Sequence, residues 1–122
     1  MFKKTIFLLL VEDDDDIIKL IKAFLKSSKV KIYVSKTGED AIDIIKTKNI
    51  NIALIDYKLP YKNGILITNE IRYINNNIPI ILETGEKMLC ESEMAKEFKF
   101  DDVICKPFNK EIVINVLKKY IK

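Results

Sequence analysis

The middle of the chain reads Ile50-Asn51-Ile52-Ala53-Leu54-Ile55-Asp56-Tyr57-Lys58-Leu59-Pro60-Tyr61-Lys62-Asn63-Gly64. Its apolar run, Ile52 to Ile55, has no helical spacing, which is typical of a strand buried on both faces. The run ends at Asp56, and Pro60 and Asn63-Gly64 then indicate a loop. Ligands of open α/β sheets bind beyond the carboxyl ends of the strands, so we expect Asp56 to lie at such a position. A lone aspartate can also simply end a strand, so its meaning depends on how the other strands end.

Apolar runs that predict strands alternate with helical patterns along the whole chain. The further predicted strands are Thr5–Val11, Val30–Val34, Pro79–Leu82 and Val103–Cys105. The predicted helices begin near Asp14–Asp16, at Thr37 and at Gly64, lie within Glu86–Lys99, and begin at Asn109. Five alternating strand–helix units predict an α/β fold of the (βα)5 doubly wound type, with a five-stranded parallel sheet between two layers of helices. We expect a single domain over residues 1–122.

The composition excludes several classes of function. Of the 122 residues, 48% are hydrophobic and 32% are charged, which is ordinary for a globular domain. The net charge is only +3 and the lysines are scattered, so we expect no nucleic-acid partner. The chain has no histidine, which rules out a Ser-His-Asp or Cys-His catalytic set and any histidine metal ligand. Phosphohistidine chemistry would therefore need a histidine of another protein.

Cysteine spacing and the apolar N-terminal run set the expected location. Cys90 and Cys105 are too far apart for a CxxC motif, and we expect a reduced cytosolic protein with two buried or half-buried thiols. The run Thr5–Val11 is too short to span a membrane and lacks the cleavage site of a signal peptide. We therefore expect a cytoplasmic protein with no membrane partner.

Polar side chains follow most of the predicted strands. Glu12 and Asp13 follow the first strand and Asp56 the third, while Thr84 and Lys106 follow the last two. In a parallel sheet these side chains reach the same edge. Crowded carboxylates repel one another unless a cation lies among them, and an oxygen-rich site suits Mg²⁺. A carboxylate can also act as a nucleophile toward phosphorus, with Lys106 and Thr84 binding the phosphoryl oxygens.

Four short motifs together form a specific pattern. They are Val11-Glu12-Asp13-Asp14, Asp56 with Leu59-Pro60 and Asn63-Gly64, Thr84-Gly85, and Lys106-Pro107-Phe108. Each motif alone is weak, but in this order they make the chain resemble the receiver domain of two-component response regulators, in its stand-alone, chemotaxis-type form. The resemblance covers essentially the whole chain and implies the flavodoxin-like strand order 2-1-3-4-5.

The resemblance implies a role for each residue at the strand ends. Asp56 would be the phosphoacceptor. Glu12 and Asp13 would hold Mg²⁺ together with Asp56, and the backbone carbonyl of Lys58 would complete the metal site. Thr84 would hydrogen-bond the phosphoryl group and move toward it on activation.

Further implied features lie at the end of the fifth strand and beside the pocket. Lys106 would form an ion pair with the phosphoryl group, and the Lys106–Pro107 peptide bond would be cis. Lys58 and Glu86 occupy positions that tune the lifetime of the phosphoryl group in this family. They could pair with each other over the pocket or remain separate solvated charges, and the sequence favours neither.

One departure from the family pattern concerns the activation switch. Receivers usually carry Tyr or Phe three residues before the lysine of the fifth strand, and here that residue is Val103. The aromatic half of the switch is therefore absent or altered. Lys99 and Phe100 stand where many receivers have a Gly-Ala-like pair, so the preceding loop is expected to differ in shape.

The resemblance implies a signalling role in a phosphorelay. The chain would take a phosphoryl group from a histidine kinase or a histidine phosphotransfer protein onto Asp56, with Mg²⁺ as cofactor. Phosphorylation would then reshape the face formed by the Glu86–Lys99 helix, the Val103–Cys105 strand and the helix from Asn109, where a protein target would bind. We expect no enzymatic activity beyond self-catalysed phosphotransfer and autodephosphorylation.

Two alternatives keep the same fold. A pseudo-receiver would act as an interaction module without being phosphorylated, but such modules usually lack the acceptor, the acidic pair or the lysine, and all are present here. The chain could also be the receiver part of a longer DNA-binding regulator or hybrid kinase. A haloacid-dehalogenase-type phosphatase would need an aspartate where this chain has Lys58.

Overall fold

Five parallel strands form one sheet in the computed structural model, which describes residues 2–91 and 97–121. The strands are β1 (Ile6–Val11), β2 (Val30–Ser35), β3 (Ile52–Asp56), β4 (Ile80–Thr84) and β5 (Asp102–Cys105). Their order across the sheet is β2-β1-β3-β4-β5, and every neighbouring pair is parallel. The predicted doubly wound (βα)5 fold with the order 2-1-3-4-5 is confirmed.

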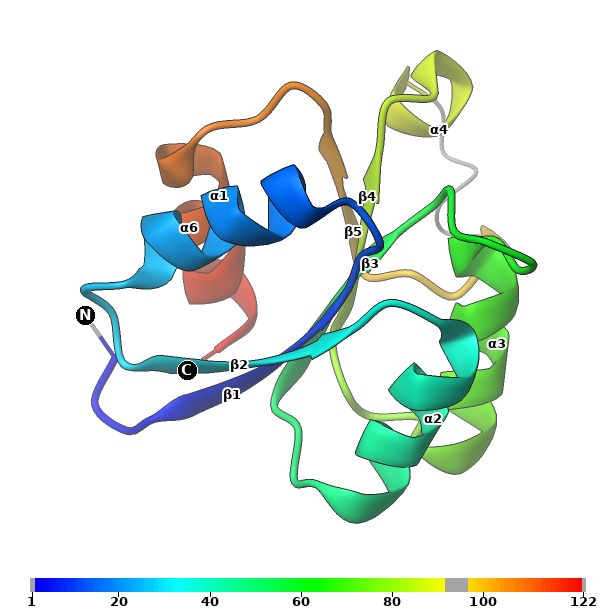
Figure 1. The fold of residues 1–122 in the computed structure, drawn as a ribbon, viewed down its shortest axis with the longest axis horizontal. Coiled ribbons are helices and arrows are strands. Elements are labelled where there is room, and N and C mark those ends of the chain that lie inside the picture. Colours follow the sequence, from blue (N-terminus) through cyan, green and yellow to red (C-terminus); the bar gives the residue numbers. More distant parts are fainter. Residues whose placement is uncertain (1, 92–96, 122) are drawn as a thin grey trace.

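Helices cover both faces of this sheet (Figure 1). The described helices are α1 (Asp15–Leu25), α2 (Gly38–Thr47), α3 (Gly64–Ile74), α4 (Lys87–Glu91) and α6 (Lys110–Tyr120). In Figure 1, α1 and α6 lie on one face and α2 and α3 on the other. The predicted helix within Glu86–Lys99 is represented by the short α4, and Met94 and Ala95, which suggested it, lie outside the described residues.

The residue before each long helix caps its first turn. The side chains of Asp14, Thr37, Asn63 and Asn109 accept hydrogen bonds from backbone N–H groups two or three residues later. Such caps satisfy donors that have no partner inside the helix. At the start of α1, capping therefore accounts for Asp14, and Asp15 and Asp16 add favourable negative charge to the first turn.

Alternation along the strands divides the core into two apolar layers. Leu8, Leu10, Leu54 and Ile81 pack in the layer that includes residues of α1 and α6. The strand residues between them pack on the other side with α2 and α3 residues such as Ala41 and Ile67. Because strand side chains alternate between faces, the residue two positions beyond Leu10, Leu54 or Ile81 continues the same layer.

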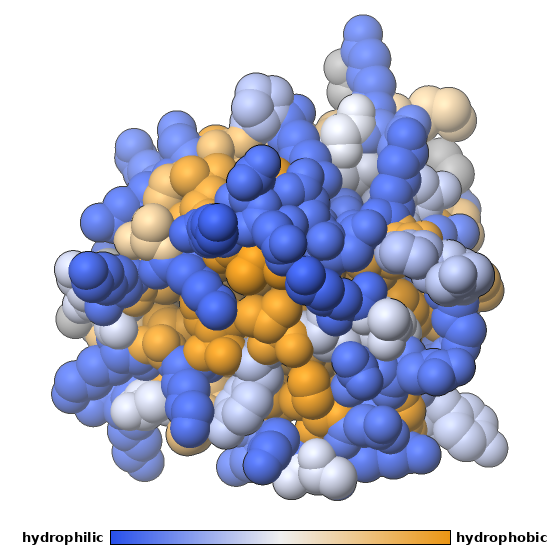
Figure 2. Space-filling view, in the orientation of Figure 1, coloured by the Kyte–Doolittle hydropathy of each residue, from blue (hydrophilic) through white to orange (hydrophobic). Residues whose placement is uncertain are grey.

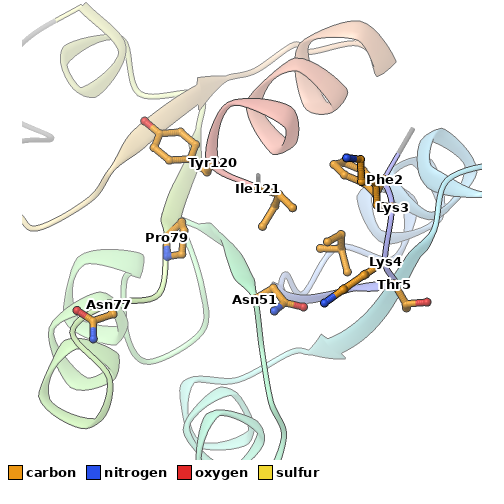
Figure 3. Close-up of a pocket in the computed structure, with 10 residues that line it drawn as sticks. Phe2, Lys3, Lys4, Thr5, Asn51, Asn77, Pro79, Tyr120 and Ile121 are labelled. Atoms are coloured by element: carbon orange, nitrogen blue, oxygen red, sulfur yellow. The ribbon is translucent and has the colours of Figure 1, made fainter.

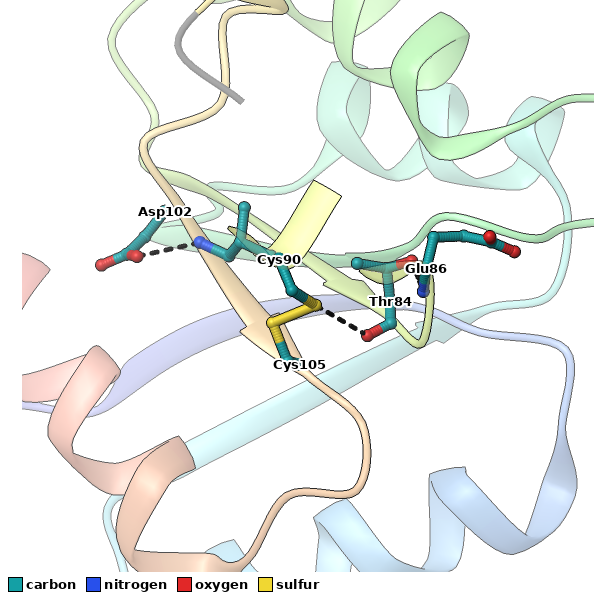
Figure 4. Close-up of a disulfide and its surroundings, with 6 residues drawn as sticks. Thr84, Glu86, Cys90, Asp102 and Cys105 are labelled. Carbon is teal, nitrogen blue, oxygen red and sulfur yellow. Dashed lines mark hydrogen bonds between the residues drawn. A yellow bond between two sulfur atoms is a disulfide. The ribbon is translucent and has the colours of Figure 1, made fainter. Parts of the chain in front are cut away.

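The two cysteines form a disulfide, which corrects the prediction of two reduced thiols. Cys90 lies in α4 and Cys105 ends β5 (Figure 4). Their Cα atoms are 5.8 Å apart, within the range that a disulfide bridges. The cysteines are 15 residues apart in sequence, but the packing of α4 against β5 brings them together. Sequence spacing alone did not reveal this contact.

The surface is mostly polar on the face seen in Figure 2, with strips of apolar surface between hydrophilic side chains. Among the described residues, the exposed large apolar side chains are Leu20, Tyr61, Leu66, Tyr73, Ile74, Met88 and Ile112. Among the helices that the structure describes, none has the length and apolar character needed to cross a membrane.

Candidate functional site

Three carboxylates meet at the carboxyl ends of β1, β3 and β4. Glu12 and Glu83 are fully buried and Asp56 is only 4% exposed. Asp56 is in register with Glu83, and Val11, the residue before Glu12, is in register with Ile55. One oxygen atom from each carboxylate lies within 4.8 Å of the others. The parallel register therefore places Glu12, Asp56 and Glu83 in one row. This row continues the core layer that includes residues of α1 and α6.

Glu83 was not predicted as a site residue. The apolar run of the fourth predicted strand ends at Leu82, and the sequence singled out Thr84 but not Glu83 at the end of that strand; β4 runs to Thr84. The signal that could have found it is strand alternation. Glu83 is two residues beyond the buried Ile81 and therefore lies on the same face of the sheet.

Lys106 is the cation of this pocket. Its Nζ lies 3.2 Å from Asp56 Oδ1 and 3.4 Å from Glu83 Oε1. Partial burial disfavours the charged amine, but the negative charges of Asp56 and Glu83 outweigh this effect and raise the pKa of Lys106. Lys106 therefore stays positively charged and is shared between two carboxylates.

The buried carboxylates lack sufficient hydrogen-bond donors. Burial, the hydrogen bond with Glu83 and the charges of Glu83 and Asp56 raise the pKa of Glu12 to about 9. Burial is also the main cause that raises the pKa of Glu83. When Glu12 is ionised, its Oε1 and both oxygens of Glu83 have no hydrogen-bond donor among the described residues. Buried oxygens of this kind fit a divalent cation, which accepts carboxylate ligands.

Asp13 lies apart from this buried group. It follows Glu12 at the end of β1, but its side chain is exposed, and the carboxylate group found in the described part of the chain does not include it. The predicted acidic pair is therefore divided into a buried Glu12 and an exposed Asp13.

Thr84 ends β4 beside the row of carboxylates and is almost completely buried. Its hydroxyl oxygen accepts a hydrogen bond from the backbone N–H of Glu86, 2.9 Å away. Its carbonyl oxygen accepts a bond of 2.8 Å from the backbone N–H of Lys106 and lies 3.7 Å from Cys90 Sγ. Because a disulfide sulfur carries no hydrogen, this last approach is a packing contact; Figure 4 shows Cys90 and Cys105 beside Thr84.

The other predicted site residues surround this centre. Lys58 Nζ and Glu86 Oε1 form an exposed ion pair of 2.8 Å, so the two charges do pair with each other. The Lys106–Pro107 peptide bond is cis, as expected. Val103 is half-buried and packs in the core layer that includes α2 and α3 residues.

Gly64 fixes the distance between α3 and the end of β3. A Cβ atom at this position would lie 2.7 Å from the carbonyl oxygen of Asp56, closer than atoms can approach. The backbone N–H of Gly64 also donates a bond of 2.8 Å to the carbonyl of Tyr57. The first residue of α3 therefore packs directly against the backbone that carries Asp56.

Two hollows lie outside the carboxylate row. A hollow of about 330 Å³ is lined by Ile17, Leu20, Lys106, Pro107 and Phe108 and adjoins the pocket through Lys106. A larger hollow of about 720 Å³ is lined by residues 2–6 and by residues that include Asn51, Pro79 and Tyr120 (Figure 3). Its lining contains none of the predicted site residues, so the chemistry belongs to the opposite edge of the sheet.

Curated proteins include relatives of this chain. The curated relatives include the cell cycle response regulator CtrA of Brucella ovis, which is 32% identical over 106 residues. That match covers 87% of this chain and 46% of the relative, so the chain spans about half the length of this regulator.

Solved structures share the fold. The receiver domain of the sensor histidine kinase PA1611 from Pseudomonas aeruginosa PAO1, which has a magnesium ion coordinated in its active site cleft, is 26% identical with a TM-score of 0.84; the match covers 94% of this chain and 96% of that domain. A CheY-like receiver domain protein from Methanospirillum hungatei JF-1 is 24% identical with a TM-score of 0.87, over 97% and 94% of the two chains.

A family model also matches almost the whole chain. The model describes the response regulator receiver domain and matches residues 8–118, from within β1 to within α6. The matched region therefore contains Glu12, Asp56, Glu83, Thr84 and Lys106. This chain belongs to the response regulator receiver domain family.

Proposed function

We propose that residues 1–122 act as one phosphorylatable receiver domain and that Asp56 accepts a phosphoryl group from a phosphohistidine of a partner protein. The observation that carries this proposal is the position of Asp56. It ends the central strand β3, is almost fully buried, and has the Lys106 ammonium 3.2 Å from its Oδ1 atom. A carboxylate beside a fixed cation is suited to attack phosphorus, because the cation neutralises charge on the incoming phosphoryl group.

In the proposed transfer, one bond forms at Asp56 and one bond breaks at the partner's phosphohistidine. An oxygen of Asp56 attacks the phosphorus atom and forms an O–P bond, while the N–P bond of the phosphohistidine breaks. The bonding electron pair returns to the imidazole nitrogen, which takes a proton from solvent. Lys106 pairs with the transferred group, and the buried hydroxyl of Thr84 becomes a donor to it once it leaves the N–H of Glu86. The partner is a histidine kinase or a histidine phosphotransfer protein, since this chain has no histidine.

Mg²⁺ is the proposed cofactor. Glu12 and Asp56 would hold it, with Asp13 and the backbone carbonyl of Lys58 as further ligands. The donor-free oxygen of Glu12 within the carboxylate group supports this assignment. When bound, Mg²⁺ neutralises the carboxylates and the phosphoryl oxygens. The receiver domain of PA1611 has a magnesium ion in its active site cleft, which supports the choice of cation.

The hollow beside Lys106 is the proposed docking surface for the phosphohistidine partner. Ile17, Leu20 and Phe108 present apolar surface next to the reacting carboxylate. Leu20 is exposed on α1 and takes no part in the carboxylate row. Leu20→Glu is therefore expected to slow transfer from a phosphohistidine protein while leaving phosphorylation by acetyl phosphate unchanged. Equal loss with both donors would contradict a docking role.

The proposed output surface is the face formed by α4, β5 and α6. Met88 on α4 is 71% exposed and offers apolar surface to a protein target. Val103 stands where an aromatic switch residue is usual, so we propose that Thr84 and α4 carry the change without it. We propose a cytoplasmic location, no nucleic-acid or membrane partner, and no activity beyond self-catalysed phosphotransfer and autodephosphorylation.

Intact mass spectrometry tests the phosphoacceptor role. The protein is incubated with Mg²⁺ and acetyl phosphate, alongside Asp56→Asn and samples containing a chelator. We expect the addition of one phosphoryl group that is absent from Asp56→Asn and from the chelated samples. An unmodified wild-type mass under every condition would refute the proposal and favour a pseudo-receiver that binds its partner constitutively.

A further inference from the structure

Glu83 occupies a core position of the sheet with a charged side chain. It is in register with Asp56 of β3 on one side and with Ile104 of β5 on the other. Its side chain continues the layer of Leu54, Ile81 and Ile104, and none of it is exposed. A carboxylate in such surroundings strongly disfavours folding unless a partner compensates for the lost hydration.

The described partners of Glu83 provide only part of that compensation, and least of it when Glu12 is ionised. Neither of its oxygens accepts a hydrogen bond of good geometry from a described residue when Glu12 is ionised. The nearest cation, Lys106, is 3.4 Å from Oε1 and is shared with Asp56 at 3.2 Å. Once a bound cation displaces the proton of Glu12, the three carboxylates and one ammonium carry a net charge of −2, since three negative charges minus one positive charge remain. The charge that is missing equals that of one divalent cation.

The geometry points to Glu83 as a further ligand of the divalent cation: we propose that this β4 carboxylate binds the ion together with Glu12 and Asp56. This inference rests on the Mg²⁺ site of the proposed function and adds to it a ligand that none of the four sequence motifs contains. The oxygens of the three side chains already lie within 4.8 Å of one another. Oxygen ligands about 2.1 Å from Mg²⁺ are roughly 3 to 4 Å apart, so small side-chain rotations bring them to a common ion.

The proposal has two consequences that differ from those of a passive buried charge. Loss of the Glu83 carboxylate weakens cation binding, because one ligand and one negative charge disappear. The same loss stabilises the metal-free protein, because a buried carboxylate whose lost hydration is only partly compensated is removed, while Lys106 keeps its ion pair with Asp56. Replacing a residue that only supported the fold would not both weaken cation binding and stabilise the metal-free protein.

Calorimetric titration of the metal-free protein with MgCl₂, and separately with MnCl₂, tests the first consequence. The variants are Glu83→Gln, which removes the charge, Glu83→Asp, which keeps the charge on a shorter side chain, and Glu83→Val, which fits the apolar layer. We expect at least tenfold weaker binding for all three. Glu111→Gln, which removes an exposed carboxylate in the first turn of α6, is expected to bind as the wild type does.

Thermal unfolding with a chelator and with saturating Mg²⁺ gives the second readout. Glu83→Val is expected to melt at a higher temperature than the wild type in chelator and to gain less from Mg²⁺. If Glu83→Asp binds Mg²⁺ as tightly as the wild type, Glu83 acts only through its charge and the ligand role is overturned. Wild-type affinity in Glu83→Gln would overturn the ligand role as well. If Glu83→Val does not fold, the Gln and Asp variants still decide the question.

The two proposals fail in different ways. If the wild-type protein binds neither Mg²⁺ nor Mn²⁺, the metal site of the proposed function is itself wrong. If the wild type binds Mg²⁺ and is phosphorylated on Asp56 while every Glu83 variant binds Mg²⁺ equally well, only the role of Glu83 is wrong.

Discussion

The two edges of the sheet treat buried charge in opposite ways. At the amino edge, where the parallel strands begin, the Arg72 side chain is only 8% exposed and is surrounded by hydrogen-bond acceptors. It donates to the carbonyl oxygens of Asn76, Ile78 and Lys99 and forms an ion pair of 2.7 Å with Asp101. At the carboxyl edge, Glu12 and Glu83 are buried with oxygens that have no donor when Glu12 is ionised.

This difference separates a charge that is paired within the fold from charges that we propose bind a cation. Arg72 ties the end of α3, the following loop and the start of β5 into one unit, and each of its contacts is internal to the fold. The carboxylates at the other edge hold a proton between Glu12 and Glu83 in the metal-free protein, and once Glu12 is ionised they have oxygens without a donor among the described residues. A buried group without partners in an otherwise paired fold is therefore evidence for a ligand.

The largest effect on stability is expected at the amino edge. Arg72→Met leaves the carboxylate of Asp101 and several carbonyl oxygens without their donor, and we expect a loss of about 3 to 5 kcal/mol in the free energy of unfolding. Urea denaturation measures it. Lys119→Met removes an exposed charge from the same edge and serves as the control, with no change expected. A loss below about 1 kcal/mol for Arg72→Met would mean that the two edges do not differ as described.

A slightly smaller effect is expected from the disulfide beside the carboxyl edge. Dithiothreitol, or the double change Cys90→Ser and Cys105→Ser, opens a loop whose ends are 15 residues apart. Loops of that length gain about 3 kcal/mol from a cross-link, mainly through the unfolded chain. Urea denaturation with and without the reductant measures the loss, and the double variant should no longer respond to reductant. A wild-type midpoint that does not move with dithiothreitol would mean that the bond is absent in solution or contributes nothing.

A pH dependence follows from the raised pKa of Glu12. In the unfolded chain this carboxyl ionises near its ordinary pKa of 4.5, whereas in the metal-free native protein it holds its proton to about 9. Between these values the native state binds more protons, so the free energy of unfolding falls as the pH rises, by on the order of 2 kcal/mol or more. Urea titrations at pH 5, 7 and 9 in chelator measure the fall. Glu12→Gln should flatten the profile, and an equally steep profile in that variant would assign the effect elsewhere.

The smallest effect is expected from the exposed ion pair of Lys58 and Glu86. Lys58 and Glu86 are both largely solvent-accessible, and exposed pairs contribute little to stability. Lys58→Ala is therefore expected to leave the urea midpoint unchanged while altering the lifetime of phosphorylated Asp56 a few fold, because the Lys58 ammonium interacts with the charge of Asp56. The rate of phosphoryl loss, followed by intact mass, measures this. An unchanged lifetime in both Lys58→Ala and Glu86→Ala would remove these residues from the site.

Strand residues explain how far the sequence could predict this fold. Uninterrupted apolar runs such as Thr5–Val11 and Ile52–Ile55 carry a strong signal, because a strand covered by helices on both faces has no solvent-facing side. The cap residues Asp14, Thr37 and Asn109 mark helix starts for a local reason as well. These signals lie within a few residues of one another, so one sequence is enough to find them.

Contacts between distant segments were harder to predict. Glu83 was missed because its neighbour in the pocket is Asp56 of another strand, and only the register places them together. The disulfide was missed because Cys90 and Cys105 meet through the packing of α4 on β5. Asp13 was expected beside Glu12, but its side chain is exposed while that of Glu12 is buried.

Gly64 limits how this chain can change. The space in which a side chain at residue 64 would stand is occupied by the carbonyl oxygen of Asp56. Even an added methyl group must therefore push α3 away or move the backbone of the residue proposed to accept the phosphoryl group. A glycine with no chemistry of its own thus counts as part of the reactive centre, and a survey of tolerated substitutions should find position 64 as restricted as the acidic positions themselves.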